Sequence, residues 1–203
     1  MPIRAVICDL FDVLLLAGDA AHSCAYEQRM DLPERGLREA MQRSLYFREA
    51  VIGRKSGEEL WRDVALGIGE APENWRMLVD VYCSAIALNS GLVAFLRSLR
   101  PRYKTAILSN ASAEVRTFIT ETFHLDREFD LIIISSEEGT RKPEPEFYRL
   151  ALSRLDVRPG EALFIDDEQR YIDGAVALGM HALQFRDTTQ VIGEMKRYLE
   201  REE

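Results

Sequence analysis

The fold is decided by residues 3–14, with the sequence Ile-Arg-Ala-Val-Ile-Cys-Asp-Leu-Phe-Asp-Val-Leu. The apolar run at 5–8 contains β-branched residues and predicts a short strand that is buried on both faces. Asp9 follows at the C-terminal end of this strand. Ligands of open α/β sheets bind outside the carboxyl ends of the strands, so Asp9 is a candidate catalytic residue. Asp is also a common helix N-cap, and only the rest of the chain can decide between the two roles.

From Leu88 onward, the chain alternates between strand and helix patterns. Amphipathic helices separate the predicted strands, Pro145 suits the first turn of one helix, and Gly179 suits the C′ position of another. Val191, Met195 and Leu199 mark a closing helix. This alternation predicts a parallel sheet with helices on both faces. The strands are expected at 104–108, 131–134, 162–165 and 181–185.

Residues 19–87 differ because they show only helical patterns. Apolar residues at i, i+3, i+4 and i+7 begin at Trp75, and Ser56 with Glu59 forms a capping box at the start of another helix. We therefore expect a small four-helix bundle inserted after the first strand. The predicted fold class is α/β, a Rossmann-like parallel sheet core with an inserted helical-bundle cap. The core domain would comprise 1–18 and 88–203, and the cap domain 19–87.

Composition narrows the range of partners. A net charge of −8 over 203 residues, without a basic stripe, argues against binding to nucleic acid or to an anionic membrane surface. No 18-residue apolar span is present, and Asp9 interrupts the apolar run near the N-terminus where a signal peptide would need one. The three cysteines lack CxxC spacing, so neither a disulfide framework nor a zinc site is expected. These features predict a cytoplasmic protein, monomeric or homodimeric, acting on a small molecule.

Polar residues follow three of the predicted strands, and another lies on the loop after a fourth strand. Each has an ordinary structural alternative: a helix cap, a solvated surface lysine or a turn. Their joint placement favours a functional site, because the carboxyl ends of parallel strands share one edge of the sheet. The residues are Asp9, Ser109, Asn110, Lys142, Asp166 and Asp167.

Three carboxylates at one edge need a counter-charge, because like charges raise one another's pKa. A hard divalent cation supplies it, and an oxygen-only ligand set suits Mg²⁺ shared with a substrate phosphate. Ser109, Asn110 and Lys142 would then supply hydrogen-bond donors and positive charge for the phosphoryl oxygens. The residues alone thus predict a Mg²⁺ site that handles a small phosphorylated molecule.

The sequence resembles the haloacid dehalogenase-like (HAD) superfamily of hydrolases over nearly its whole length. Four motifs match in order: a strand ending in Asp9, Leu-Ser-Asn at 108–110, Lys142 before Pro143, and Phe-Ile-Asp-Asp at 164–167. The run Lys-Pro-Glu-Pro-Glu-Phe-Tyr at 142–148 and Ala-Leu-Gly-Met-His at 177–181 look especially like this family. The helical block after the first strand is similar to the small cap of one subgroup.

The resemblance implies a role for each matching residue. Asp9 would be the nucleophile that forms an aspartyl-phosphate, and Lys142 would bridge it to the phosphoryl group. Ser109 would bind the phosphoryl group, with Asn110 as a supporting contact. The implied metal ligands are Asp9, the backbone carbonyl of Phe11 and Asp166, with Asp167 holding metal-bound waters.

One position departs from the family pattern. Phosphatases of this family usually carry a general-acid Asp two residues after the nucleophile, where this chain has Phe11, and Asp12 stands where the family often has Gly. General acid–base help is worth roughly 10²–10⁴-fold in rate. An enzyme without it can still act on acyl or aryl phosphates, whose leaving groups need no proton. One residue of displacement is expected to point Asp12 away from the leaving group.

The sequence therefore predicts a Mg²⁺-dependent hydrolase of small phosphorylated substrates, with weak or narrow activity. One alternative is a catalytically impaired protein that binds phosphate and metal. The other is a 2-haloacid dehalogenase, a branch that also carries an aromatic residue at the position of Phe11 but lacks the paired acids of Asp166 and Asp167. Four cap cations could reach a second anionic group, although a solvated helix face is the simpler interpretation: Arg29, Arg48, Arg54 and Lys55.

Overall fold

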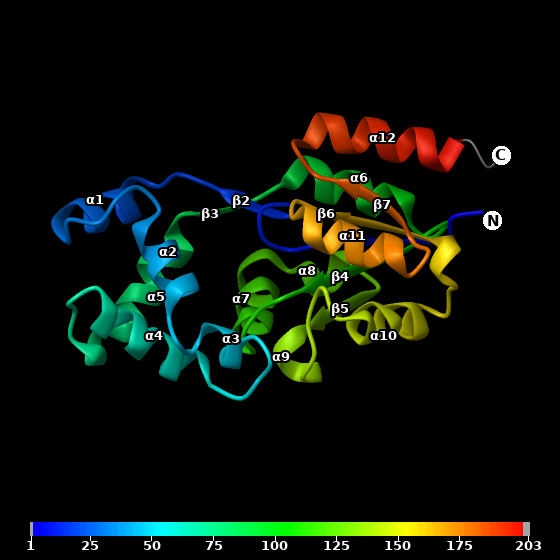
Figure 1. Cartoon of the computed structure of the whole chain (residues 1–203). Coiled ribbons are helices and arrows are strands. Elements are labelled where there is room, and N and C mark those ends of the chain that lie inside the picture. Colours follow the sequence, from blue (N-terminus) through cyan, green and yellow to red (C-terminus); the bar gives the residue numbers. More distant parts are fainter. Residues whose placement is uncertain (1, 201–203) are drawn as a thin grey trace.

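Five parallel strands form the central sheet of the protein, in the order β5-β4-β1-β6-β7 (Figure 1). The structure is a computed structural model that describes residues 2–200. The prediction of a Rossmann-like parallel sheet is confirmed. β4 and β6 each extend one residue further than predicted, and β7 is one residue shorter. The strands are β1 (Ala5–Cys8), β4 (Lys104–Ser109), β5 (Leu131–Ile134), β6 (Ala162–Asp166) and β7 (His181–Gln184).

Helices cover both faces of the sheet because successive strand side chains point to opposite sides. Val6 and Cys8 face a core formed with α6 (Ser90–Leu99), α7 (Glu114–Phe123), α8 (Leu125–Glu128) and α12 (Thr188–Glu200). Ala5 and Ile7 face the other core, with α10 (Pro145–Leu155) and α11 (Gln169–Ala177). The predicted Pro145 start of α10 and the left-handed Gly179 after α11 are both confirmed. The one-turn helices α9 (Ser135–Glu138) and η2 (Pro159–Glu161) complete this part of the chain.

A separate helical unit follows β1 and packs around its own apolar core, which includes Leu37, Leu60, Val64 and Leu78. The predicted capping box of Ser56 starts α4. We call this unit the cap helices; the domain limits at 18/19 and 87/88 stay a prediction. The cap helices are α1 (Ala21–Arg29), α2 (Gly36–Arg43), α3 (Phe47–Ala50), α4 (Gly57–Gly67) and α5 (Trp75–Ser84), with η1 (Pro72–Asn74) between the last two.

The cap helices join the sheet through a two-stranded antiparallel ribbon of β2 (Leu15–Ala17) and β3 (Ile86–Leu88). The prediction of helix alone for 19–87 is therefore wrong at Ile86 and Ala87. Three-residue strands are too short to show an alternating pattern, and the partners lie far apart in sequence. No helix in residues 2–200 is long and apolar enough to cross a membrane.

The segment between α3 and α4 also contacts the carboxyl edge of the sheet directly. The buried Ser135 hydroxyl donates to the carbonyl of Val51, which follows α3, and accepts from the backbone N–H of Ala111 at 3.0 Å. A close approach lies beside it: Gly53 has φ +75°, and a Cβ there would lie 2.2 Å from the carbonyl oxygen of Ser136. Only glycine fits this junction, so the cap helices lie over the sheet edge in a defined position.

Candidate active site

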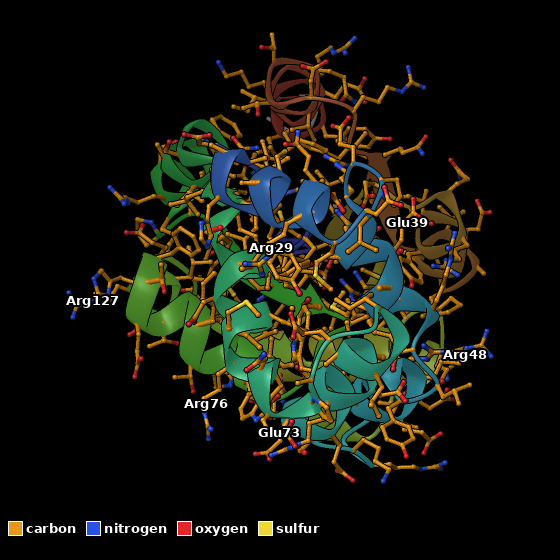
Figure 2. All side chains as sticks on the ribbon, turned by 90° about the vertical axis from the view of Figure 1, so that its left-hand side faces the viewer. Arg29, Glu39, Arg48, Glu73, Arg76 and Arg127 are labelled. Atoms are coloured by element: carbon orange, nitrogen blue, oxygen red, sulfur yellow. The ribbon has the colours of Figure 1, made fainter. Side chains whose placement is uncertain are left out.

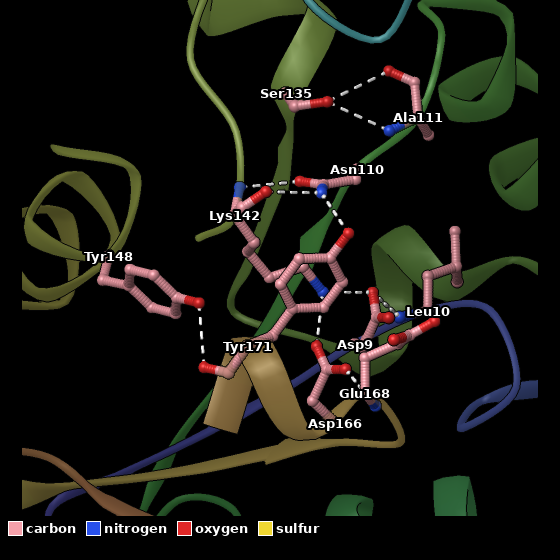
Figure 3. Close-up of polar contacts among 10 residues, drawn as sticks. All are labelled: Asp9, Leu10, Asn110, Ala111, Ser135, Lys142, Tyr148, Asp166, Glu168 and Tyr171. Carbon is pink, nitrogen blue, oxygen red and sulfur yellow. Dashed lines mark hydrogen bonds and ion pairs between the residues drawn. The ribbon is translucent and has the colours of Figure 1, made fainter. Parts of the chain in front are cut away.

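The structure brings Asp9, Lys142 and Asp166 into direct contact at the carboxyl edge of the sheet (Figure 3). Lys142 Nζ lies 2.7 Å from Asp9 Oδ1 and 2.6 Å from Asp166 Oδ2. Asp9 follows β1 and Asp166 ends its neighbour β6, so the parallel register of these strands places the two carboxylates together. Lys142 is 1% exposed, which rules out the interpretation as a solvated surface lysine.

The helix-cap alternatives are also wrong. Asp9 precedes a tight loop leading to β2, and its Oδ1 accepts from the backbone N–H of the next residue, Leu10, at 2.7 Å. The helix after Ser109 and Asn110 starts only at Glu114, and neither residue caps it. The turn alternative holds in part, because Asp166 Oδ1 accepts from the N–H of Glu168 at 2.9 Å. That bond fixes the Asp166 carboxylate while its other oxygen contacts the lysine.

Asn110 holds the backbone of Lys142 in place. Its side-chain oxygen accepts from the Lys142 N–H at 2.8 Å, and its amide nitrogen donates to the Lys142 carbonyl at 2.9 Å and to the Tyr171 hydroxyl at 3.1 Å. Tyr148 in turn donates from its hydroxyl to the Tyr171 carbonyl at 2.9 Å (Figure 3). No sequence pattern pointed to Tyr171. Asn110 therefore orients the lysine rather than pointing at the carboxylates.

Ser109 is fully buried at the end of β4, and its hydroxyl has no hydrogen-bond partner among the described residues. Buried polar groups are nearly always paired, so an unpaired hydroxyl at the edge that carries Asp9 calls for a missing partner. An anionic ligand oxygen would accept its hydrogen bond. The predicted phosphoryl-binding role of Ser109 is compatible with this position.

Burial makes the carboxylates hard to ionise. It raises the pKa of Asp166 to about 7 and that of Asp167 to about 6, and in both cases the Asp9 charge adds to the effect. Burial also raises the pKa of Asp9, although Lys142 partly offsets it. Burial alone would lower the pKa of Lys142, but the charges of Asp9 and Asp166 outweigh it and raise that pKa. One ammonium thus contacts two of the three carboxylates, and ionising all three would leave negative charge uncompensated.

The donor set fits a divalent cation. One carboxylate oxygen from each of Asp9, Asp166 and Asp167 can be chosen so that all three lie within 4.8 Å of one another. Oxygen-only ligands of this kind suit Mg²⁺, whose charge would balance the cluster. These three residues would hold the metal. The implied ligation by the backbone carbonyl of Phe11, and the implied role of Asp167 in holding metal-bound waters, stay predictions.

Asp12 points to a different partner. Its backbone has φ +59°, and its carboxylate binds the guanidinium of Arg38 on α2 through two hydrogen bonds, one of them 2.9 Å between Nη1 and Oδ1. This bond raises the pKa of Arg38. Both carboxylate oxygens of Asp12 thus accept hydrogen bonds from Arg38, so this side chain is not placed as a proton donor for the leaving group. Phe11 lines the cavity beside it.

A cavity of about 440 Å³ opens above the carboxylates, between the sheet edge and the cap helices. Asp9, Asn110, Lys142 and Asp167 line its floor. Of the four cap cations considered above, only Arg48 lines it; Arg54 pairs with Glu49, Lys55 pairs with Glu59, and Arg29 stacks on Tyr26. This cavity gives a small molecule access to the carboxylates.

The known proteins that this chain is similar to include a haloacid dehalogenase and a phosphatase. (S)-2-haloacid dehalogenase 1 from Pseudomonas sp. (strain CBS-3) is 32% identical over 194 residues, which cover 90% of this chain and 84% of that protein. Phosphoserine phosphatase from Thermus thermophilus is 30% identical over 131 residues, covering 62% and 53% of the two chains. The chain spans only 39% and 13% of two longer relatives.

Among solved structures, the HAD family enzyme bt-2542 from Bacteroides thetaiotaomicron, in complex with magnesium and inorganic phosphate, superposes with a TM-score of 0.73. It is 19% identical, and the match covers 91% of this chain and 94% of that one, so it shows a shared fold. A family model for haloacid dehalogenase-like hydrolases matches residues 3–179. Since that match takes in most of the sequence, from Asp9 to the helix after Asp167, the chain belongs to the haloacid dehalogenase-like hydrolase family.

Proposed function

We propose that the protein is a Mg²⁺-dependent hydrolase of small phosphorylated substrates that works through an aspartyl-phosphate on Asp9. The observation that carries this proposal is the group of three carboxylates, Asp9, Asp166 and Asp167, two of which contact the buried Lys142. A divalent cation would balance the charge of that group, and the buried Ser109 hydroxyl, which is unpaired among the described residues at the same edge, would donate to a phosphoryl oxygen. A relative that is a phosphatase and a structural neighbour with magnesium and phosphate support the proposal.

The proposed chemistry proceeds in two displacements at phosphorus. Asp9 Oδ1 is held by Lys142 and Leu10, so the other carboxylate oxygen attacks phosphorus, and the bond from phosphorus to the leaving-group oxygen breaks. Water then attacks the aspartyl-phosphate and releases inorganic phosphate, which restores the Asp9 carboxylate. Lys142 and Ser109 would donate to the phosphoryl oxygens. Bound Mg²⁺ would neutralise phosphoryl charge during both displacements.

A second candidate function is hydrolysis of a 2-haloacid. The 32% identity to a 2-haloacid dehalogenase favours it, as does Phe11 in place of the general acid. In that reaction Asp9 would attack the halogen-bearing carbon, release halide, and form an ester that water hydrolyses. The reaction needs no metal, and a metal-free nucleophile gains nothing from the neighbouring Asp166 and Asp167. We therefore rank it second.

The test compares the parent protein with Asp9→Asn, using acetyl phosphate and p-nitrophenyl phosphate with Mg²⁺ or with EDTA. Asp173→Asn, an exposed change of the same kind on α11, is the matched control. We expect Mg²⁺-dependent release of phosphate that Asp9→Asn abolishes and the control retains. Chloride release from (S)-2-chloropropionate in EDTA would favour the dehalogenase instead. Phosphate binding without any turnover would leave the non-catalytic interpretation.

A further inference from the structure

Above the carboxylates, the cavity continues into an apolar chamber. Its walls come from the cap helices, the segment after α5 and the core helix α7. Trp61 and Tyr82 contact each other there, with ring centroids 5.4 Å apart. Aromatic rings and branched aliphatic side chains dominate this part of the wall: Phe47, Val51, Leu60, Trp61, Val79, Tyr82, Ile86, Val115 and Phe118.

Several of the charged groups that line the cavity already have polar partners. Arg38 binds Asp12, and Glu114 accepts from the backbone N–H of Gly57 at 2.8 Å. Arg170 lies 3.5 Å from Glu168. Arg48 and Arg141 also line the cavity, and the exposed Arg48 lies at the periphery of the face that the cap presents (Figure 2). The part of a ligand that enters this chamber therefore meets apolar surface, and burying an aromatic ring there is favourable.

The catalytic edge imposes a separate requirement on the leaving group. Phe11 cannot donate a proton, and the Arg38 guanidinium binds both carboxylate oxygens of Asp12, so neither residue is placed as a proton donor for the leaving group. The oxygen that leaves phosphorus must then depart as an anion. A phenolate does so readily because a phenol has a pKa of about 10, far below that of an alkyl alcohol. The apolar wall of the chamber and the need for an anionic leaving group thus both indicate an aryl group next to the phosphate.

We propose that the substrate is a phosphate monoester of a phenol or similar aryl alcohol, with the ring in the apolar chamber. This proposal rests on the proposed function. The oxygen–phosphorus bond breaks as Asp9 attacks, the aryloxide leaves with the electron pair, and it takes a proton from solvent. Recognition of the ring, in addition to its reactivity, distinguishes this proposal from general phosphatase activity.

Non-hydrolysable phosphonates separate binding from reactivity. With acetyl phosphate as substrate in Mg²⁺, we expect phenylphosphonate to inhibit with a Ki at least about tenfold lower than that of methylphosphonate, the effect of burying one ring. Equal Ki values would overturn the proposal while leaving the proposed function intact, because acetyl phosphate has no ring. Failure to hydrolyse acetyl phosphate would instead refute the proposed function. Tighter binding of a carboxyalkyl phosphonate than of phenylphosphonate would also overturn the proposal, since a wall cation such as Arg48 would then select the ligand.

Two matched variants place the ring. Phe118 lines the chamber. Phe123, on the same helix, packs against the Phe118 ring but does not line the chamber. Phe118→Ala is expected to weaken phenylphosphonate binding about five- to tenfold without changing methylphosphonate binding, and Phe123→Ala to leave the ratio unchanged. If both variants changed the ratio equally, the effect would be structural and the proposal would lose its support.

Fluorescence supplies a readout that needs no turnover. The chain has two tryptophans, of which Trp61 lines the chamber and Trp75 does not. In Trp75→Phe, emission therefore comes from Trp61 alone. We expect phenylphosphonate to change this emission saturably at concentrations that match its Ki, and methylphosphonate to leave it unchanged. An unchanged signal during full inhibition by phenylphosphonate would place the ring elsewhere and refute the proposal.

Discussion

Asp167→Asn is expected to stabilise the metal-free protein at neutral and alkaline pH. Burial, with the charges of Asp9 and Asp12, raises the pKa of Asp167 to about 6 from 3.8. Between these two pH values the folded state binds more protons than the unfolded state, so stability falls as the pH rises through this window. Above pH 6 the folded protein carries the full cost of an ionised Asp167, and asparagine removes that cost.

The size of the effect follows from the two pKa values. Their difference corresponds to about 3 kcal/mol at 1.36 kcal/mol for each pH unit. Asp167 is only partly buried, and solvent screening reduces the expected gain to about 1–2 kcal/mol. In a chain of this length, that gain raises the melting temperature by roughly 2–8 °C.

Urea unfolding in EDTA at pH 7.5 and pH 4 measures the effect, with Asp173→Asn as the control for a change of charge on the surface. We expect the gain at pH 7.5, its near disappearance at pH 4, and no such pattern in the control. Added Mg²⁺ should stabilise the parent protein more than Asp167→Asn, because the variant lacks one carboxylate of the proposed metal site. A variant that is less stable than the parent at pH 7.5 in EDTA would show that ionised Asp167 does not destabilise the folded protein.

Three further predictions address the junction, the acid stability and the missing proton donor. Ser135→Ala removes the hydrogen bond to Val51 and should cost about 1–3 kcal/mol in urea unfolding, because the backbone groups it leaves are buried; an unchanged midpoint would contradict this. Hydrogen bonds from Arg158 lower the pKa of Glu161 to about 2. The ionised Glu161 therefore stabilises the folded state above its unfolded pKa, and this contribution is lost as the pH falls toward 2. Glu161→Gln should flatten the acid limb of a pH–stability curve. Phe11→Asp should raise turnover of alkyl phosphates at least about tenfold relative to acetyl phosphate, and an equal change for both would show that proton donation was not limiting.

The sheet was predictable because the sequence patterns that indicate its strands are local. The apolar runs that form the five strands are each bounded by turn residues, and the resulting order of strands and helices leaves few topologies. Contacts between distant segments were not predictable. β2 and β3 are three residues each and pair across the whole helical insertion, and the one-turn helices α8 and α9 have no periodicity to detect.

The candidate site shows the same division. Strand ends predicted that Asp9, Asp166 and Lys142 would lie at one edge, and the structure places them within hydrogen-bond distance. Sequence reasoning expected Asp12 to point away from the leaving group but could not name Arg38 as its partner, because that contact depends on how α2 is placed. Asn110 was expected as a supporting contact, and that role stays a prediction; the sequence did not show that its side chain binds the backbone of Lys142.

The central position of β1 has a consequence for synthesis on the ribosome. β1 is made first, but its two neighbours in the sheet, β4 and β6, begin at residues 104 and 162. At about 5–20 residues per second, roughly 8–30 s pass before the second edge of β1 can be paired. Until then at least one edge of this apolar strand stays unpaired in the nascent chain, a state prone to aggregation. Chaperone binding to the nascent N-terminal segment would therefore protect the strand that later presents Asp9.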